Sequence, residues 1–462
     1  MAQAISPPAL NRPRRRPSRP TVSVPLLLSV AIALAISMGL AIAVDPKYAY
    51  LGAVAVVGPV AIFYIVSSPA LATCVALAAH TWGMELSGQY VTPFKIFGVL
   101  AILVVGTDIA RRRRLHPVPR LYSYGVALLL VLVAVGELLA EFEGSMGPFF
   151  EFGGTLVIFG LLTQTIVTPA DLRTLTRVYV VNLVLTVVSV WLEVGWSALG
   201  ESGMRAGGIC GHPNALGNHL AMSLPFALAL LTDRNEGWAW RTTALFAALG
   251  SAYGEWGAAS RGGTIGFLVA LFAFALLAPR RNALRGLAFA AAVATAAGFS
   301  SFAPHSFDRV TETLDAGTDL DAAASERSLH ARIAADMLPR HPFLGAGVTA
   351  FGYDRSRYSG TLGGALHSSV LAVGVAYGLP ALLLYVLLQF SGVIAMVRHF
   401  GTGPDRVYHA ALACGALAAI TSSLSGTELF RAEQWSVIGL CHIATLRTTV
   451  AEAARERGKS GT

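Results

Sequence analysis

The chain has 462 residues, of which 54% are hydrophobic and only 13% are charged, and its mean hydropathy is +0.60. Apolar runs of about 20 residues recur along the whole sequence, which excludes a soluble globular protein and predicts a polytopic membrane protein. The formal net charge of +8 comes almost entirely from arginine. In a membrane protein such an excess indicates cytoplasmic loops rather than nucleic-acid binding.

Both ends of the chain are predicted to lie in the cytoplasm. Residues 1–21 contain the Pro- and Arg-rich stretch NRPRRRPSRP, which cannot bury a core and is expected to be a disordered basic tail. One polytopic membrane domain is predicted over residues 22–449, followed by a second cytoplasmic tail at 450–462. The first apolar run is longer than the hydrophobic region of a typical signal peptide, so we interpret it as a retained anchor.

About fourteen transmembrane helices are predicted, at residues 22–44, 49–66, 69–87, 94–110, 121–140, 149–167, 177–197, 213–231, 242–258, 263–279, 286–303, 367–396, 406–425 and 434–449. With the N-terminus inside, the arginine-rich connections all fall in the cytoplasm, as the positive-inside rule requires. Twelve or thirteen spans also fit the sequence, because the run at 69–87 contains His80, Trp82 and Glu85. The four cysteines show no CxxC spacing, so we interpret them as packing residues.

The long connection at 304–366 is predicted to be extracytoplasmic and folded, because loops of more than about 15 residues are usually functional or disordered and this one contains SERSLHARIAADMLPRHPFLGAG at 325–347. Its apolar spacing predicts a short amphipathic helix ended by Pro339 and Pro342. Arg327 and His330 are expected near the polar face of that helix. Gly345 and Gly347 permit a sharp turn back towards the membrane.

The next apolar run opens with LHSSVLAVGVAYG, residues 366–378, in which His367 and Ser368 are followed by nine residues and Gly378. Together with the HPFLGAG turn, this arrangement resembles the superfamily of O-antigen ligases and O-antigen polymerases. Two upstream stretches are similar to the family pattern as well: MRAGGICGHPNALGNHL at 204–220, with Arg205 and Asn214, and SRGGTIG at 260–266, with Arg261.

The resemblance implies an all-α integral membrane fold of the GT-C-like ligase type, with about 12–14 transmembrane helices and one long extracytoplasmic loop that contains short helices. It implies a glycosyltransferase in the bacterial cytoplasmic (inner) membrane. Such an enzyme takes a glycan from an undecaprenyl-diphosphate carrier at the outer face and passes it to a hydroxyl acceptor on a glycan, a lipid or a wall polymer, with no metal or other cofactor. Ligase and polymerase activity both remain open, as do the sugars that are joined.

The residue types suit that chemistry. Arginine binds phosphate oxygens bidentately, so Arg205, Arg261 and Arg327 are candidates for the donor diphosphate, and Arg327 is also a candidate catalytic residue because it stabilises charge as the sugar–phosphate bond breaks. Imidazole has a pKa suited to general-base catalysis, which makes His367 the candidate base. The competing interpretation of His367 is an ordinary helix start capped by a serine. For Arg205 and Arg261 it is contact with lipid headgroups, and for Arg327 a surface ion pair with Glu326 or Asp308.

Four further residues are predicted to support the site. Ser368 would orient His367 or cap its helix. Glu255 is a carboxylate inside a predicted span, where ionisable groups are costly and are functional candidates by default. Asn214 belongs to the stretch at 204–220 that is similar to the family pattern, and His330 lies near Arg327 on the predicted amphipathic helix. His219 is interpreted as a packing or hydrogen-bonding residue rather than a metal ligand. The short outer loop with Glu428, Arg431 and Glu433 is a further candidate for completing the site.

A polytopic transporter or a flippase of lipid-linked oligosaccharide or another envelope precursor is the alternative function. Transporters commonly show internal repeats and binding groups near the membrane midplane. The sequence shows no repeat, and its polar candidates gather at one predicted face. This placement favours an enzyme that works on a membrane-embedded substrate. A scaffold component of an envelope assembly complex is a third alternative, and it would leave His367 and the outer arginines without a role.

Overall fold

The computed structural model divides the chain into two compact units, Met1–Tyr64 and Ile65–Thr462. Within the second unit, the structure describes residues 65–83, 93–140, 145–197, 206–258, 260–279, 281–282, 285, 320–351, 368–399, 405–424, 426 and 431–460, and it gives no side chain for 193–197, 261, 320–328 and 451–460. The predicted tail at 1–21, the spans at 22–44 and 286–303 and nearly all of the span at 49–66 lie outside the described residues.

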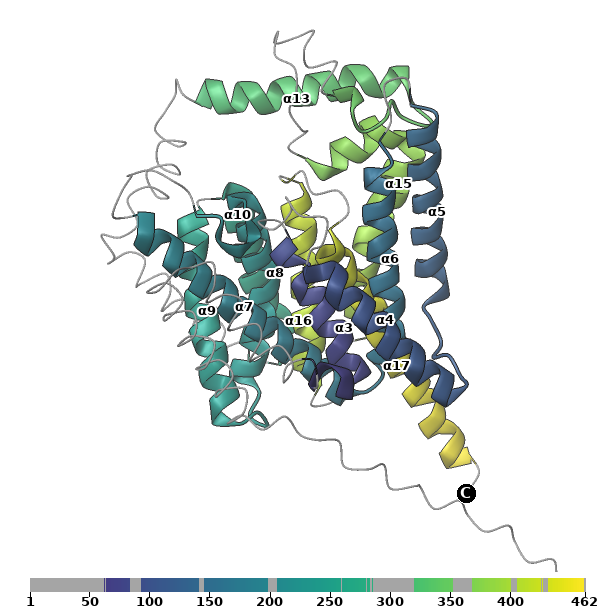
Figure 1. Cartoon of the computed structure of the whole chain (residues 1–462), viewed down its shortest axis with the longest axis vertical. Helices are drawn as coiled ribbons and strands as arrows, with labels where there is room; N and C mark the ends of the chain where they lie inside the picture. Colours follow the sequence, from purple (N-terminus) through teal and green to yellow (C-terminus); the bar gives the residue numbers. More distant parts are fainter. Residues whose placement is uncertain are drawn as a thin grey trace, which may run out of the picture. The chain divides into compact units, whose positions relative to one another are not determined.

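All secondary structure in the described ranges is helical (Figure 1). The elements are α3 (Pro69–Ala79), η1 (Thr81–Gly83), α4 (Pro93–Arg112), α5 (Arg120–Leu138), α6 (Gly147–Thr165), α7 (Pro169–Ser197), η2 (Gly208–Cys210), α8 (Pro213–Thr232), α9 (Trp238–Ala258), α10 (Arg261–Leu277), α13 (Leu320–Arg340), α15 (Ser369–Arg398), α16 (Arg406–Ser423) and α17 (Ala432–Ser460). Within the described part of the chain, five helices are long and apolar enough to cross a membrane: α4, α5, α7 over Pro169–Leu192, α8 and α15. The predicted all-α membrane class is confirmed.

The helix at the start of the predicted span 69–87 is shorter than that span. α3 has 11 residues, about 16 Å of helix, whereas a hydrocarbon core is about 30 Å thick. The chain turns at η1 because polar groups there find partners inside the bundle: Trp82 Nε1 donates to Asn182 Oδ1 at 2.7 Å, and Asn182 Nδ2 donates to Thr81 Oγ1 at 3.2 Å. Buried polar groups of this kind are tolerated in a membrane protein only when they are satisfied internally.

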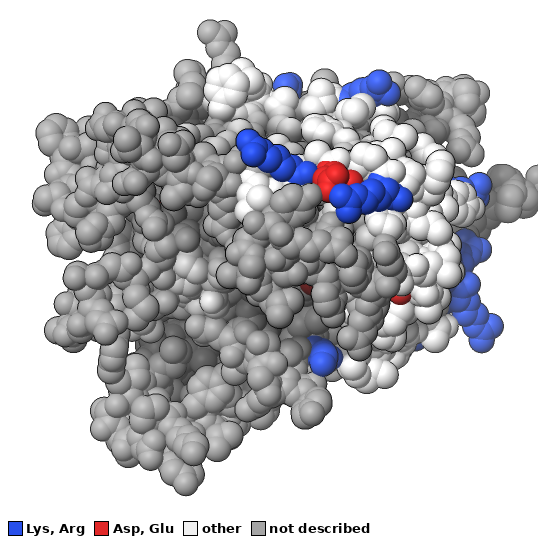
Figure 2. All heavy atoms as spheres, turned by 90° about the horizontal axis from the view of Figure 1, so that it is seen from above, with Lys and Arg blue, Asp and Glu red and all other residues white. Residues whose placement is uncertain are grey.

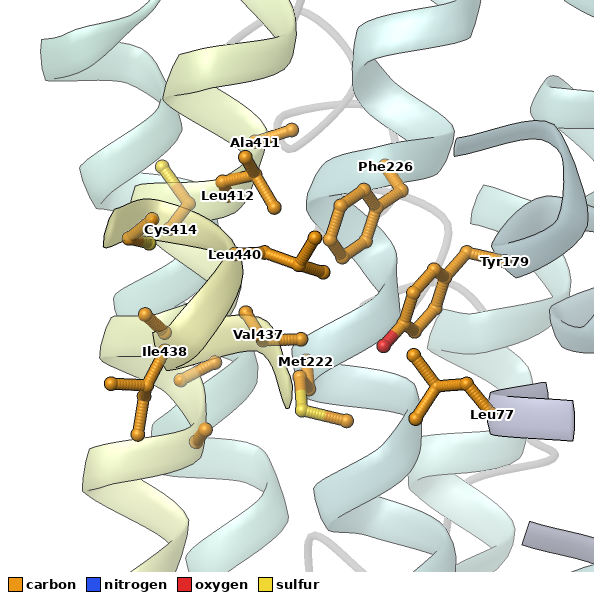
Figure 3. Packing of buried hydrophobic residues seen from close by; sticks show 14 of the residues in the cluster. Leu77, Tyr179, Met222, Phe226, Ala411, Leu412, Cys414, Val437, Ile438 and Leu440 are labelled. Atoms are coloured by element: carbon orange, nitrogen blue, oxygen red, sulfur yellow. The ribbon is translucent and has the colours of Figure 1, made fainter. Parts of the chain in front are cut away.

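The core of the unit is built on α8 and α16. Most of the 20 residues of α8 are buried, and α16 is rich in alanine and glycine, so its backbone approaches α8 closely. A Cβ on Gly415 would lie 3.0 Å from the carbonyl oxygen of Met222. Figure 3 shows Phe226 beside Tyr179 of α7 and close to the side chains of α16 and α17, and the Phe226 and Tyr179 rings stack at 4.5 Å with an interplanar angle of 12°.

α4 shows the opposite pattern and marks a lipid-facing side. Of its 20 residues only Ala101 and Val105 are buried, while Ile96, Val99 and Leu103 are more than half exposed. Apolar side chains that face outward along a 20-residue apolar helix are expected where the solvent is lipid rather than water.

The start of α7, the turn between α8 and α9 and the start of α16 meet at one end of the unit, which we call the arginine end. Arg177 pairs with Glu236 at 2.7 Å, and the Tyr408 hydroxyl donates to Asp233 at 2.7 Å and to Glu236 at 3.0 Å. These segments were all predicted to be cytoplasmic from their arginines. Their meeting at one end is what an alternating series of spans requires.

The C-terminal end of α6 continues the arginine end, because only a short connection separates it from α7. Arg447 Nη2 donates to the Thr163 carbonyl at 2.7 Å, and Arg112 Nη2 lies 3.5 Å from the Gln164 carbonyl. Two guanidinium groups thus bind carbonyls that a helix C-terminus leaves without an intrahelical partner, and their charge complements the helix dipole.

Two local features differ in detail from the sequence predictions. α13 has 21 residues, and Pro339 lies inside it rather than ending it. α17 continues to Ser460, through most of the predicted tail at 450–462. The four cysteines are free and buried, as their interpretation as packing residues requires.

Candidate functional site

A small polar cavity lies at the end of the unit where α8, α15 and α17 begin, which we call the cavity end. Its volume is about 20 Å³, room for about one water molecule. The lining residues are Asn218, His219, Met222, Ser369, Ala419, Ser422, Ser423, Gly426, Arg431, Glu433 and Gln434. Four helices, with Arg431 directly before α17, therefore supply hydroxyl, amide, imidazole, carboxylate and guanidinium groups to one cavity.

His219 and Glu433 form the most deeply buried ionisable pair of this cavity. His219 Nδ1 lies 2.9 Å from Glu433 Oε1, and the two side chains are 0% and 2% exposed. On its other side the ring meets α7, where Asn182 Nδ2 lies 3.4 Å from His219 Nε2. A buried carboxylate of this kind is costly unless neighbouring groups compensate it. Arg431, which is 7% exposed, lines the same cavity.

The beginning of α15 forms another wall. Ser368 is the N-cap of α15, and its side chain accepts a hydrogen bond from the Leu371 backbone N–H. Ser369 Oγ donates to the Gly426 carbonyl at 2.8 Å. The two serines of the motif thus have different tasks: Ser368 caps the helix, and Ser369 lines the cavity. His367 directly precedes them in sequence and itself lies outside the described residues.

α15 is broken at Gly378, whose φ of 82° and ψ of 177° are not helical. The HPFLGAG turn fills the break. The Leu379 N–H donates to the Pro342 carbonyl at 2.7 Å, and the Ala346 and Gly347 N–H groups donate to the carbonyls of Val375 and Ala376 at 2.9 and 3.0 Å. Backbone groups freed by a helix break at membrane depth need such partners. The HPFLGAG turn and Gly378, both singled out in the sequence, thus belong to one structural feature, whereas the break itself lies within a span predicted to be continuous at 367–396.

Glu137, near the C-terminal end of α5, accepts hydrogen bonds from the chain around the HPFLGAG turn and the break in α15. Its Oε1 accepts hydrogen bonds from the Tyr377 hydroxyl at 3.0 Å and the Val348 N–H at 3.2 Å, and its Oε2 accepts from the Ser145 N–H at 2.9 Å. Glu137 is 4% exposed. One buried carboxylate therefore joins α5, the connection to α6, the HPFLGAG turn and α15.

Glu255 lies inside α9 and is 4% exposed, so it does not face a polar loop. Its Oε1 accepts a hydrogen bond from Thr264 Oγ1 of α10 at 3.3 Å. A Cβ on Gly263 would come within 2.5 Å of the same oxygen, and one on Gly217 within 3.0 Å. Glycines on α8 and α10 thus make room for this carboxylate at the cavity end.

α13 lies against the first part of α15, and its buried side carries Ile333, Met337 and His330. The expected position of His330 on the polar face is wrong. The ring is 2% exposed and meets Phe351 edge-on at 5.0 Å, because the turn after α13 folds back over it. The exposed side of α13 carries Arg332 and Arg340, and Figure 2, which views the end of the molecule with α13, shows acidic side chains between basic ones.

The remaining predicted site residues are placed only in part. Arg261 begins α10 after the N-cap Ser260, and Arg327 lies within α13; the structure gives no side chain for either. Arg205 lies outside the described residues. Asn214 stands in the first turn of α8, where its N–H donates to His212 Nδ1 at 3.2 Å. The backbone positions of Arg261 and Asn214 both belong to the cavity end.

Sequence reasoning gave little weight to the groups that line the cavity. From the sequence His219 is interpreted as a packing or hydrogen-bonding residue, and the loop with Glu428, Arg431 and Glu433 is only a further candidate. The sequence feature that could have indicated these residues also applies to Glu255. A histidine and a carboxylate lie within or beside apolar runs, where ionisable groups are rare and costly.

Residues 245–386 match a family model described as O-Antigen ligase. This segment belongs to the O-antigen ligase and polymerase superfamily. It runs from within α9 to the second half of α15, so it contains Glu255, the HPFLGAG turn and the break at Gly378. The match confirms the resemblance stated from the motifs and indicates a membrane glycosyltransferase of the O-antigen ligase type. No curated protein and no solved structure matches the chain.

Proposed function

We propose that this protein transfers or polymerises a glycan from an undecaprenyl-diphosphate carrier onto a hydroxyl acceptor at the outer face of the bacterial cytoplasmic membrane. The observation that carries the proposal is the ligase-family match over residues 245–386, which covers the HPFLGAG turn, the break at Gly378 and Ser369, a lining residue of the cavity. The cavity end then faces outside and the arginine end faces the cytoplasm, in agreement with the positive-inside rule.

In the proposed reaction the acceptor oxygen attacks the anomeric carbon, the bond from that carbon to the phosphate oxygen breaks, and its electron pair leaves with the lipid diphosphate. His367 takes the proton of the acceptor hydroxyl. General-base catalysis of this kind contributes typically about 100-fold to 10,000-fold. Direct displacement inverts the configuration at the anomeric carbon.

Arg205, Arg261 and Arg327 bind the diphosphate in this proposal. Their planar guanidinium groups pair bidentately with phosphate oxygens, and stabilising the charge that develops on a leaving group is worth several kcal/mol in a water-poor site. The arginines thereby take the place of a divalent metal. Support for the assignment comes from the positions of Arg261 at the start of α10 and Arg327 on α13. Ser368, Asn214, Glu255 and His330 contribute by holding the surrounding helices.

The broken helix α15 is the one observation that favours a transporter, since discontinuous helices carry the binding groups of many transporters. In this chain the groups freed at the break are occupied by the HPFLGAG turn, through the Leu379, Ala346 and Gly347 N–H bonds. They are therefore not available to a transported substrate. The break supports the enzyme proposal better, because it anchors the loop that carries Arg327.

The testing experiment is glycan transfer in detergent with EDTA, a lipid-diphosphate glycan as donor and a panel of hydroxyl acceptors. Wild type is expected to transfer glycan under chelation, and His367→Ala and Arg327→Ala are each expected to lose at least about 100-fold in rate at normal abundance. The size ladder of the products separates polymerase from ligase. Movement of intact donor across vesicles without any modified acceptor would show a flippase instead.

A further inference from the structure

The hydrogen-bond partners of Asn182 fix how its amide is oriented. Trp82 Nε1, which can only donate, lies 2.7 Å from the Asn182 oxygen. The Thr81 hydroxyl donates its hydrogen to the Ala78 carbonyl at 2.7 Å, so it accepts from Asn182 Nδ2 at 3.2 Å. The amide therefore presents its oxygen to Trp82 and its NH₂ group to Thr81 and to His219.

This orientation assigns the tautomer of His219. With the Asn182 NH₂ group directed at it over 3.4 Å, Nε2 has to accept and carries no proton. The neutral ring then carries its proton on Nδ1, which faces Glu433 Oε1 at 2.9 Å. A buried chain from Trp82 through Asn182 and His219 thus places a protonated ring nitrogen 2.9 Å from Glu433 Oε1. This contact does not have the geometry of a hydrogen bond, so Glu433 Oε1 keeps an acceptor position that no described group fills.

The charges around the cavity then balance. Among the described lining residues, Glu433 is the anion and Arg431 is the cation, while His219 is neutral. The other polar groups are uncharged, from Asn218, Ser369, Ser422, Ser423 and Gln434. A diphosphate needs concentrated positive charge, which this cavity does not supply. Its volume of about 20 Å³ also admits only a group of about the size of one water molecule.

We propose, on the basis of the proposed transfer function, that this cavity receives a hydroxyl group of the acceptor glycan and that Glu433 accepts its hydrogen bond. Glu433 is then an acceptor-binding residue, and His219 and Asn182 are positioning residues. The acceptor hydroxyl enters beside Ser369, two residues after His367 in the sequence, while the diphosphate binds the three arginines of the proposed function. The two substrates are thereby held on groups of different charge.

The test is steady-state transfer kinetics of Glu433→Gln, with donor and acceptor varied separately. Glutamine keeps the size of the side chain and removes its charge, and a charge-assisted hydrogen bond is worth about 1.5–3 kcal/mol. The expected result is a fall in kcat/KM for the acceptor of about tenfold to 150-fold, with the KM for the donor unchanged. Equal loss for both substrates, or an unchanged kcat/KM for the acceptor, would overturn the proposal.

Glu236→Gln is the matched control. Glu236 is a buried carboxylate too, at 5% exposure, but it lies at the arginine end, beyond the C-terminus of α8. Thr232 lies 13 positions after His219 in the same helix, which at 1.5 Å per position corresponds to about 20 Å. This variant therefore measures the loss of stability caused by neutralising a buried carboxylate that lies away from the cavity. It is expected to lower thermal stability while kcat/KM for the acceptor stays at the wild-type value.

The positioning role of His219 and Asn182 is tested by a separate measurement, which requires neither transfer activity nor a folded Glu433→Gln variant. In ¹⁵N-histidine spectra, the His219 resonance, identified by its loss in His219→Gln, is expected to show a protonated Nδ1 and a bare Nε2. Asn182→Asp presents a carboxylate to Nε2 and is expected to protonate both nitrogens. A wild-type ring protonated on Nε2 would refute the assignment. Absence of transfer by wild type with every acceptor would instead refute the proposed function and leave the tautomer result standing.

Discussion

Gly378 and Phe343 pack backbone against backbone: a Cβ added to Gly378 would lie 2.5 Å from the Phe343 carbonyl group. Gly378 also has a φ of 82°, which side-chain-bearing residues rarely adopt. Both constraints act at the point where the HPFLGAG turn enters the break in α15. The glycine that closes the sequence motif is therefore required by the fold, whatever part it has in the reaction.

Gly378→Ala is expected to destabilise the protein by about 1–3 kcal/mol, because the alanine is strained at a positive φ and its methyl group meets the Phe343 carbonyl. Thermal unfolding in detergent measures this as a lower Tm. Gly98→Ala on α4 is the control, since a Cβ there has nothing within 4 Å, and its Tm should equal or exceed that of wild type. Equal stability of the two variants would contradict the tight packing at the break.

Tyr377→Phe removes the hydroxyl that donates to Glu137 at 3.0 Å. Glu137 keeps its bonds from Val348 and Ser145, so the expected loss is about 1.5–3 kcal/mol, the usual value for a hydrogen bond to a charged group. The Tm and the rate of proteolysis after α13 should both report it. Tyr124→Phe, at a side chain that is 71% exposed, is expected to change neither.

Two arginines at the arginine end should differ in their importance for stability. Arg177 pairs with a Glu236 side chain that is 2% exposed, so Arg177→Ala leaves a buried carboxylate with only the Tyr408 hydroxyl and should cost about 3 kcal/mol or more. Arg173 pairs with Asp405, which is 25% exposed, and Arg173→Ala should cost about 1 kcal/mol or less. Unfolding of both variants under the same conditions gives the comparison, and a reversed order would refute it.

His116 lies in the connection between α4 and α5, and its titration is expected to make the stability of the folded protein depend modestly on pH. Partial burial and the neighbouring Arg112 and Arg447 lower the pKa of His116 below its usual value of 6.5. The folded state then binds fewer protons than the unfolded state, so this contribution to stability is present above about pH 6.5 and is lost as the pH falls through that value towards the folded pKa.

The measurement is the Tm of wild type and of His116→Gln between pH 7.5 and 5. The His116 backbone N–H donates to Gln164 Oε1 at 2.8 Å, and Gln164 Nε2 donates to the His116 carbonyl at 3.1 Å. Neither hydrogen bond involves the replaced ring, so both should persist. The variant is expected to lose less stability than wild type on acidification. If both lose the same amount, groups other than His116 govern the acid sensitivity.

The sequence by itself determined the class of the protein and the approximate position of most described helices. A run of about 20 apolar residues is stable in a bilayer as a transmembrane helix, because a helix satisfies its backbone hydrogen bonds internally. It also identified the family, since the motifs at HPFLGAG and at 367–378 are local. Helix ends were less certain where polar groups turn inward, as at Thr81 and Trp82, or where a helix runs through a proline, as at Pro339.

Only the tertiary structure decided which distant residues share a site. Asn182, His219 and Glu433 come from α7, α8 and α17, and the turn at 341–347 meets the break at Gly378 through backbone bonds that no side-chain pattern reveals. Apolar helices in lipid associate through shape, small residues and a few polar contacts rather than through a hydrophobic face visible in the sequence. Their neighbours, and therefore the partners of each buried ionisable group, follow from packing that local periodicity does not encode.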